Sequence, residues 1–136
     1  PFLTHFGPFM PHISIMETFF KTKHKVLLQE FIEESSGEDV RAFIVENRVV
    51  AAMVRKAKKG EFRSNLHRGG TSYKGDLTEE EERIALEAVK VMGLKIAGVD
   101  ILRSNRGPLI IEVNASPGLE GIENTTKVNI LFCQFF

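Results

Sequence analysis

Val-Asp-Ile-Leu-Arg-Ser-Asn-Arg-Gly-Pro-Leu-Ile-Ile-Glu-Val-Asn-Ala-Ser-Pro-Gly occupies residues 99–118. The run holds two apolar segments separated by Asn-Arg-Gly at 105–107, which are residue types that accept the backbone dihedrals of a hairpin turn. It therefore predicts two antiparallel strands, over residues 95–102 and 109–114.

Three oxygen-bearing side chains fall on one face of this predicted hairpin. Strand side chains alternate between faces, so Glu112 and Asn114 point the same way. Folding about Arg106 brings Asp100 opposite Glu112, within one residue of register. Two buried carboxylates repel each other unless a cation, a proton or hydrogen bonds intervene, and Mg²⁺ prefers one or two carboxylates together with substrate phosphates. We therefore predict a magnesium site at Asp100, Glu112 and Asn114; the alternative is a hairpin with acidic residues on its solvent face and no metal.

Composition indicates one ordinary globular domain. The 136 residues suffice for a single core, and the 18 basic and 18 acidic residues give a net charge of zero. This balance gives no general attraction to nucleic acid or to a membrane surface, and neither is expected as a direct partner. Cys133 is the single cysteine, so no intramolecular disulfide can form, and we expect a cytoplasmic location. No apolar run is as long as a membrane span.

The clearest helix is predicted over residues 77–92. Thr78 followed by Glu81 forms a capping box, and Gly93 is a suitable C-terminal cap. The apolar stripe that would pack on a sheet consists of Ile84, Ala85, Ala88, Val89 and Met92.

The remaining elements complete an α+β pattern. A short amphipathic helix is expected over 11–22, a buried strand over 25–32, and a hairpin from 39–45 and 48–55. Residues 56–76 lack periodicity and are predicted to form a long loop. We expect an α+β fold in which helices pack on an antiparallel sheet.

Two further segments suit a nucleotide. The end of the predicted strand, Gln-Glu-Phe-Ile at 29–32, offers backbone groups and apolar cover to a planar heterocycle, and Asp39 could accept ribose hydroxyls. The basic run from Arg55 to Gly70 carries donors suited to phosphate. Taken singly, these features are equally typical of a plain strand, a solvated turn residue and a solvated basic loop. Their order along the chain predicts a nucleoside triphosphate site.

These segments resemble the ATP-grasp superfamily, and most closely its ribosomal-protein glutamate ligases, which add glutamate to the C-terminus of a small-subunit ribosomal protein. The resemblance is carried by residues 28–32, 39–41, 60–70, 98–102 and 112–123. It covers residues 25–124 as a partial ATP-grasp domain, with 1–24 and 125–136 as divergent ends. The family's phosphate-binding lysine and glycine-rich lid have no counterpart here, so the chain is expected to be the C-terminal part of that domain and inactive by itself.

The resemblance implies a role for each matching residue. The positions that match the adenine-binding hinge are Gln29, Glu30, Phe31 and Ile32. Asp39 matches the acidic residue near the ribose. The segment that contacts the phosphates of ATP is matched by Arg63, Ser64 and Asn65. The magnesium ligands are matched by Asp100, Glu112 and Asn114, and Arg63 and Arg55 are the expected catalytic cations.

The activity implied by the resemblance is ATP-dependent ligation of a carboxylate to an amine through an acylphosphate. It requires ATP with two Mg²⁺ (or Mn²⁺) ions, and its partners are glutamate and a protein or peptide C-terminus. The oligomeric state is open, a homo-oligomer included. Two alternatives are retained. One is another ATP-grasp ligase, of the lysine-biosynthesis carrier-protein or glutathione-synthetase type. The other is a non-catalytic module that binds nucleotide or metal.

Overall fold

The protein is represented by a computed structural model that describes residues 17–22, 29–58, 64 and 69–134. The chain divides into two compact units, Pro1–Phe31 and Ile32–Phe136. In the first unit, residues 17–21 are helical, which confirms the later half of the helix expected over 11–22; residues 11–16 lie outside the described part.

The prediction of a buried strand over residues 25–32 is wrong for residues 29–32, the part that the structure describes. Residues 29–32 form no strand, and Phe31 is 65% exposed. All five strands of the sheet formed by the described residues come from the second unit, so this segment gains no pairing there. An apolar segment without a neighbouring strand cannot form the backbone hydrogen bonds of a sheet. Within residues 29–32, only Ile32 is buried.

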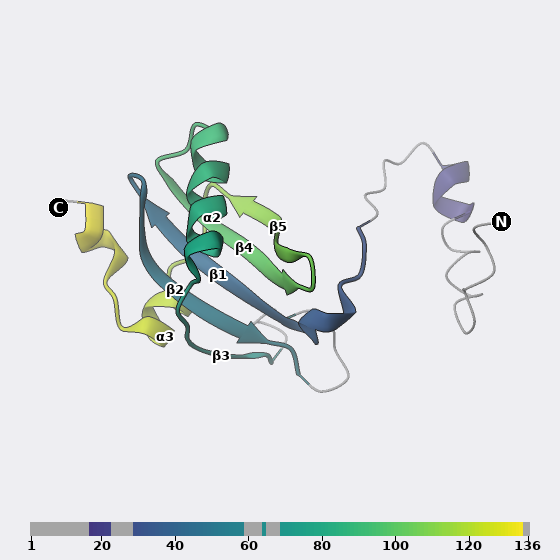
Figure 1. The fold of residues 1–136 in the computed structure, drawn as a ribbon, viewed down its shortest axis with the longest axis horizontal. Helices are drawn as coiled ribbons and strands as arrows, with labels where there is room; N and C mark the ends of the chain where they lie inside the picture. The colour runs from purple at the N-terminus through teal and green to yellow at the C-terminus, as the bar shows by residue number, and fades with distance from the viewer. Residues whose placement is uncertain (1–16, 23–28, 59–63, 65–68, 135–136) are drawn as a thin grey trace. The chain divides into compact units, whose positions relative to one another are not determined.

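The second unit is built on a five-stranded antiparallel sheet with strand order β3-β2-β1-β4-β5 (Figure 1). Its strands are β1 (Glu38–Val45), β2 (Arg48–Lys56), β3 (Thr71–Lys74), β4 (Ile96–Ser104) and β5 (Gly107–Asn114). Both predicted hairpins are confirmed. Glu46 and Asn47 have φ of 45° and 66°, the left-handed values of a two-residue hairpin turn, and Gly107 has φ of 99° after the β4–β5 turn.

The strand β3 lies inside residues 56–76, which were predicted to form a loop, so this prediction is partly wrong. It pairs with the end of β2, Thr71 opposite Lys56 and Lys74 opposite Met53, and forms one edge of the sheet. Four largely exposed residues carry too short a pattern to be recognised as a strand, so β3 exists because β2 offers it a free edge.

The helix α2 (Glu79–Val91) begins with the predicted capping box. The Thr78 hydroxyl accepts from the backbone N–H of Glu81, and the Glu81 carboxylate accepts from the N–H of Thr78. Figure 1 shows α2 lying along one face of the sheet. Met92 was expected in the apolar stripe, but it is 60% exposed because the helix ends at Val91 and the chain turns at Gly93.

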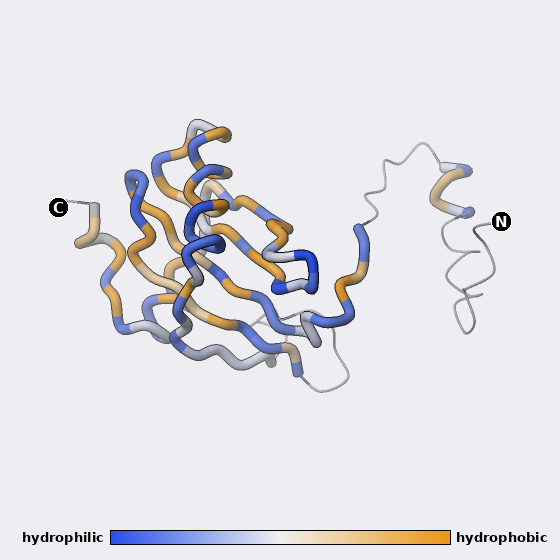
Figure 2. The backbone as a smooth tube through the Cα atoms, viewed as in Figure 1, coloured by the Kyte–Doolittle hydropathy of each residue, from blue (hydrophilic) through white to orange (hydrophobic). Residues whose placement is uncertain are grey.

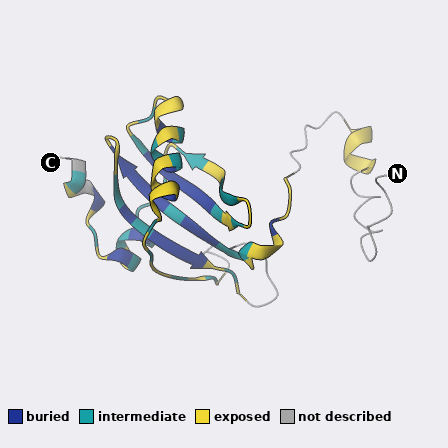
Figure 3. Ribbon diagram, in the orientation of Figure 1, coloured by how far each residue is buried: buried dark blue, intermediate teal, exposed yellow. Residues whose placement is uncertain are grey.

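The sheet carries apolar clusters on both faces because β1 alternates. On the α2 face the buried residues are Val40, Ala42, Ile44, Val54, Ala85, Val89, Ala97, Val99 and Ile101. On the other face they are Phe43, Val45, Ala51, Met53, Ile122 and Ile130. Ile122 comes from the short helix α3 (Glu120–Thr126), and Ile130 from the 3-10 helix η3 (Ile130–Gln134). Figures 2 and 3 show the apolar, buried central strands and the polar, exposed outer side of α2.

Between the two units' boundary and β1, the 3-10 helix η1 (Glu33–Ser35) contacts the β4–β5 hairpin. A Glu34 carboxylate oxygen accepts from the backbone N–H of Asn105 at 2.9 Å, and this hydrogen bond lowers the pKa of Glu34. The contact fixes the start of the second unit against the turn between β4 and β5, the two strands that carry the candidate metal residues.

Candidate functional site

Charged side chains form a row across four strands on the sheet face opposite α2. This row shares its face with the apolar cluster around Phe43, but occupies the other end of β1. The register places Asp39 opposite Arg55, and Arg41 opposite Asp100. Asp100 is in turn opposite Glu112 on β5. Directly opposed residues of antiparallel strands share a face, so all five point to the same side.

Two arginines and two aspartates of this row form a continuous ion-pair network. Arg41 donates from Nε to Asp100 Oδ1 at 2.6 Å and from Nη2 to Oδ2 at 2.7 Å. Arg55 donates to both oxygens of Asp39 at 2.6 Å, and its Nη2 also lies 2.8 Å from Asp100 Oδ2. Paired donors of this kind fix both the position and the orientation of a carboxylate.

The network is nearly closed to solvent. Asp39 is 5%, Arg55 8% and Asp100 3% exposed. Burial by itself lowers the pKa of the Arg55 guanidinium, but its hydrogen bonds to Asp39 and the charge of Asp100 outweigh that effect and raise the pKa. Arg55 therefore stays charged, and it acts as the central cation of the network.

These positions decide between the alternatives for two residues. The reading of Asp39 as a solvated turn residue is wrong, because Asp39 lies buried in β1. Arg55 belongs to the strand predicted over 48–55 and not to the basic loop, because it lies in β2. Lys56 also belongs to β2; its ammonium group pairs with Glu38, and this hydrogen bond raises the pKa of Lys56.

The predicted hairpin register is confirmed, with Asp100 opposite Glu112 and Gly98 opposite Asn114. The expectation that both carboxylates are buried is wrong for Glu112, which is exposed on the edge strand β5. The buried one, Asp100, is compensated by Arg41 and Arg55. Their guanidinium groups supply the positive charge that the sequence argument assigned to a metal ion.

The turn after β5 is fixed by a close approach over Gly98. The Oδ1 atom of Asn114 accepts from the backbone N–H of Ser116 at 2.9 Å, which closes the first step of the turn. A Cβ atom on Gly98 would lie 2.9 Å from Pro117 Cβ. The absent side chain at Gly98 therefore lets Pro117 fold back over β4 and holds Asn114 in place.

The other residues with expected roles are distributed as follows. Ser64 is buried and donates to Asp39 Oδ2 at 2.5 Å, whereas Arg63 and Asn65 lie outside the described residues. Ile32 is buried in the second unit. In the first unit, Gln29, Glu30 and Phe31 are exposed.

Arg41 was missed as a site residue, although the sequence carried a signal for it. Asp39 and Arg41 are two residues apart in an otherwise apolar strand, so alternation places both on one face. The identity of their partners could not be read, because Asp100 is 59 residues from Arg41 along the chain.

The candidate metal ligands at the hairpin are oxygen donors of the kind that Mg²⁺ prefers. Within residues 17–22, 29–58, 64 and 69–134, no three His, Cys, Asp or Glu side chains gather closely enough to hold a metal. The candidate set would therefore be two carboxylates, Asp100 and Glu112, with the amide oxygen of Asn114 on the same face. These are hard oxygen donors of the number that Mg²⁺ takes when it shares a site with phosphates, so the residues fit the ion.

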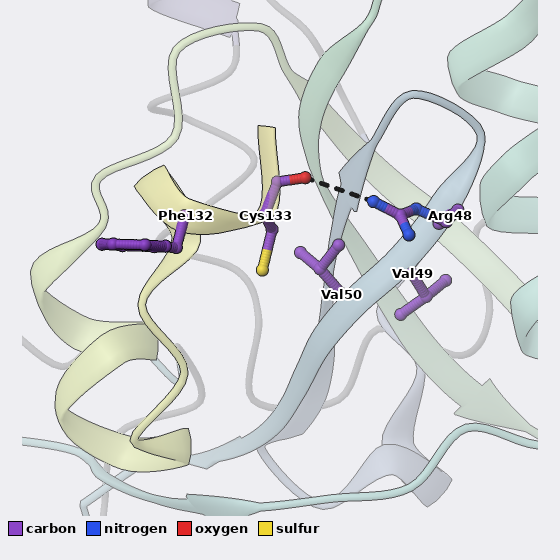
Figure 4. Close-up of a pocket in the computed structure, with 5 residues that line it drawn as sticks. All are labelled: Arg48, Val49, Val50, Phe132 and Cys133. Carbon is purple, nitrogen blue, oxygen red and sulfur yellow. Dashed lines mark hydrogen bonds between the residues drawn. The ribbon is translucent and has the colours of Figure 1, made fainter. Parts of the chain in front are cut away.

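A shallow surface cavity of about 330 Å³ lies at the opposite end of the β1–β2 hairpin (Figure 4). It is lined by Arg48, Val49, Val50, Phe132 and Cys133. Arg48 donates to the carbonyl oxygen of Cys133 at 3.2 Å and so ties the last 3-10 helix to β2. None of the predicted site residues lines this cavity, and we assign the site to the charged row.

The chain was compared with known proteins. Residues 12–132 match the model of a RimK-like ATP-grasp domain. A protein of Pseudomonas fluorescens named probable alpha-L-glutamate ligase is 58% identical over 117 residues, and one of that name from Marinobacter nauticus is 56% identical over 117. Each match covers 86% of this chain and 39% of the relative, so the chain spans about two fifths of the length of these relatives.

Solved structures show the same fold. D-alanine–D-alanine ligase of Bacillus anthracis complexed with ATP aligns with a TM-score of 0.63 at 20% identity, covering 86% of this chain and 40% of that one. The ATP-grasp ligase PsnB, complexed with a precursor variant, Mg and ADP, gives a TM-score of 0.58 at 24% identity, covering 73% and 30%. The α+β class with an antiparallel sheet is thus confirmed. No helix in the described part of the chain is long and apolar enough to cross a membrane.

Proposed function

The chain belongs to the RimK-like ATP-grasp family, and from this premise we propose that the whole protein is an ATP- and Mg²⁺-dependent ligase that joins a carboxylate to an amine. The observation that carries the proposal is the register of the β4–β5 hairpin. It places Asp100, Glu112 and Asn114 on one face, beside a buried network of guanidinium groups. Hard oxygen donors next to fixed cations suit the binding of phosphates.

We propose the following chemistry. The acceptor carboxylate attacks the terminal phosphorus of ATP, so an acylphosphate forms and ADP leaves. The amine nitrogen then attacks the acyl carbon, the amide bond forms, and phosphate departs as the amine gives up a proton. Bound at Asp100, Glu112 and Asn114, Mg²⁺ would neutralise the charge that develops on the phosphate oxygens.

The chain's own residues have positioning and binding roles in this proposal. Arg55 uses Nε and Nη2 for Asp39 and Asp100, so it acts by fixing these two carboxylates. Arg63, with Ser64 and Asn65, is proposed to contact the phosphates. Asp39 is proposed to accept from the ribose hydroxyls, and residues 29–32 to receive the adenine.

We propose glutamate as the amine substrate, and the C-terminus of a small-subunit ribosomal protein as the carboxylate. The name of the two relatives, probable alpha-L-glutamate ligase, supports glutamate. Transfer of labelled glutamate to small ribosomal subunits tests the acceptor. Label in a subunit protein, released by a carboxypeptidase, is the expected result; label confined to small carboxylic acids would rule out the ribosomal acceptor.

The metal site is tested with Glu112→Gln in the whole protein. Loss of a ligand should reduce ATP- and Mg²⁺-dependent ligation at least about a hundredfold, because a bound cation contributes several kcal/mol to charge stabilisation. The matched control is Glu87→Gln, which changes an exposed carboxylate on α2. Unchanged circular dichroism and melting would show that both variants fold. Turnover by Glu112→Gln within twofold of the unmodified protein would disprove the site.

A further inference from the structure

Arg41 occupies the oxygens that the candidate metal residue Asp100 would offer to an ion. A carboxylate has about four acceptor positions, two on each oxygen. Arg41 fills one on each oxygen, and Arg55 fills the second on Oδ2. One position on Oδ1 is left for a further ligand.

The same network balances the charge of the row. Asp39 and Asp100 are each paired with a guanidinium group, Arg55 and Arg41 respectively, so these four side chains sum to zero. Glu112 is then the one carboxylate of the row left to attract a cation. A site with one effective negative charge holds a divalent cation weakly until a further anion arrives.

We propose that Arg41 is the counter-cation of the metal site. It competes with the ion for Asp100, so that the site takes a divalent cation together with the phosphates of a nucleotide and not by itself. The proposal rests on the metal site of the proposed function and adds the residue that sets the order of binding. Arg41 is suited to this role because it is the more exposed of the two arginines, with a side chain 16% exposed against 10% for Arg55.

The position of Arg41 supports electrostatic competition between its guanidinium group and the metal ion for Asp100. Its Cδ atom would lie 3.9 Å from a Cβ on Gly98, so the side chain runs across β4 beside the residue that is opposite Asn114. The guanidinium group thus binds Asp100, and the Cδ atom that carries it lies near the position opposite Asn114.

The test measures Mn²⁺ binding to the whole protein from the loss of the free-ion electron paramagnetic resonance signal. Mn²⁺ serves as the probe because it takes the same carboxylate and carbonyl ligands as Mg²⁺. Titrations are run with and without a non-hydrolysable ATP analogue. The unmodified protein should bind Mn²⁺ weakly alone and much more tightly with the nucleotide.

Arg41→Met keeps an unbranched side chain and removes the charge. It should tighten Mn²⁺ binding without nucleotide by on the order of tenfold or more, because a positive charge next to the ion is lost. Arg41→Lys should bind like the unmodified protein. The matched control is Arg103→Met, which removes an arginine of β4 that pairs with a carboxylate, Glu81, away from the row; its Mn²⁺ affinity should not change.

Arg41→Met binding Mn²⁺ no tighter than the unmodified protein overturns the role of Arg41. Should that variant fail to fold, Arg41→Gln carries the same expectation. Glu112→Gln distinguishes failure of the metal site from failure of the proposed role of Arg41. If it leaves Mn²⁺ binding unchanged, the metal site is wrong and the inference falls with it. If binding depends on Glu112 but not on the charge at position 41, only the inference fails.

Discussion

Removing Asp39 tests how much the buried ion-pair network contributes to the free energy of unfolding. Asp39→Ala leaves the Arg55 guanidinium, which is 8% exposed, without its two bonds of 2.6 Å. Breaking a buried ion pair from one side costs about 3–5 kcal/mol. Because Arg55 keeps Asp100 at 2.8 Å, we expect the lower end, about 3 kcal/mol.

The assay is a double-mutant cycle in urea with Asp39→Ala, Arg55→Ala and the pair. The double variant removes both charges, so it should be about 2 kcal/mol less destabilised than the sum of the single variants. For a domain of this size, the expected loss in Asp39→Ala corresponds to a fall in Tm of about 10 °C.

The neighbouring pair provides the control. Glu38 and Lys56 are also opposed on β1 and β2, one position further along the strands, but their side chains are 35% and 57% exposed. Solvent screens such a pair, so its coupling should be far smaller. A coupling energy for Asp39 and Arg55 no larger than that for Glu38 and Lys56 would refute the assignment of a buried, energetically coupled network.

Two further predictions concern the supporting structure. Burial would raise the pKa of Glu81, but hydrogen bonds from Arg103 and the Thr78 backbone outweigh it and lower the pKa below 4.5. The ionised carboxylate therefore contributes stability that is complete above pH 4.5 and is lost as pH falls, so Glu81→Gln should lose less free energy of unfolding between pH 7 and pH 3 than the unmodified protein; equal losses would contradict this. Gly98→Ala places a Cβ 2.9 Å from Pro117 and should destabilise by about 1–3 kcal/mol in urea unfolding. A Cβ at Gly118 meets nothing within 4 Å, so Gly118→Ala should change the free energy of unfolding by no more than about 0.5 kcal/mol. Similar losses of stability in the two variants would show that the approach of Pro117 to Gly98 does not exclude a side chain at position 98.

The elements that local chemistry specifies were predicted from the sequence. Both hairpins and α2 follow from turn residues, alternation and the capping box, all of which act over a few residues. The same rules gave the pairing of Asp100 with Glu112, because a tight turn fixes the register of the strands that it joins. Where the local signal was short, as in β3, the prediction failed.

By itself the sequence determined which side chains share a face, because alternation along a strand is a property of the backbone. Which strands become neighbours was decided by the tertiary structure alone. β1 lies between β2 and β4, so Asp39 meets Arg55 and Arg41 meets Asp100, over separations of 16 and 59 residues. Burial of those charges depends on the same long-range pairing. No local pattern encodes that pairing, so only the folded sheet shows that Asp100 is held by arginines while Glu112 stays exposed.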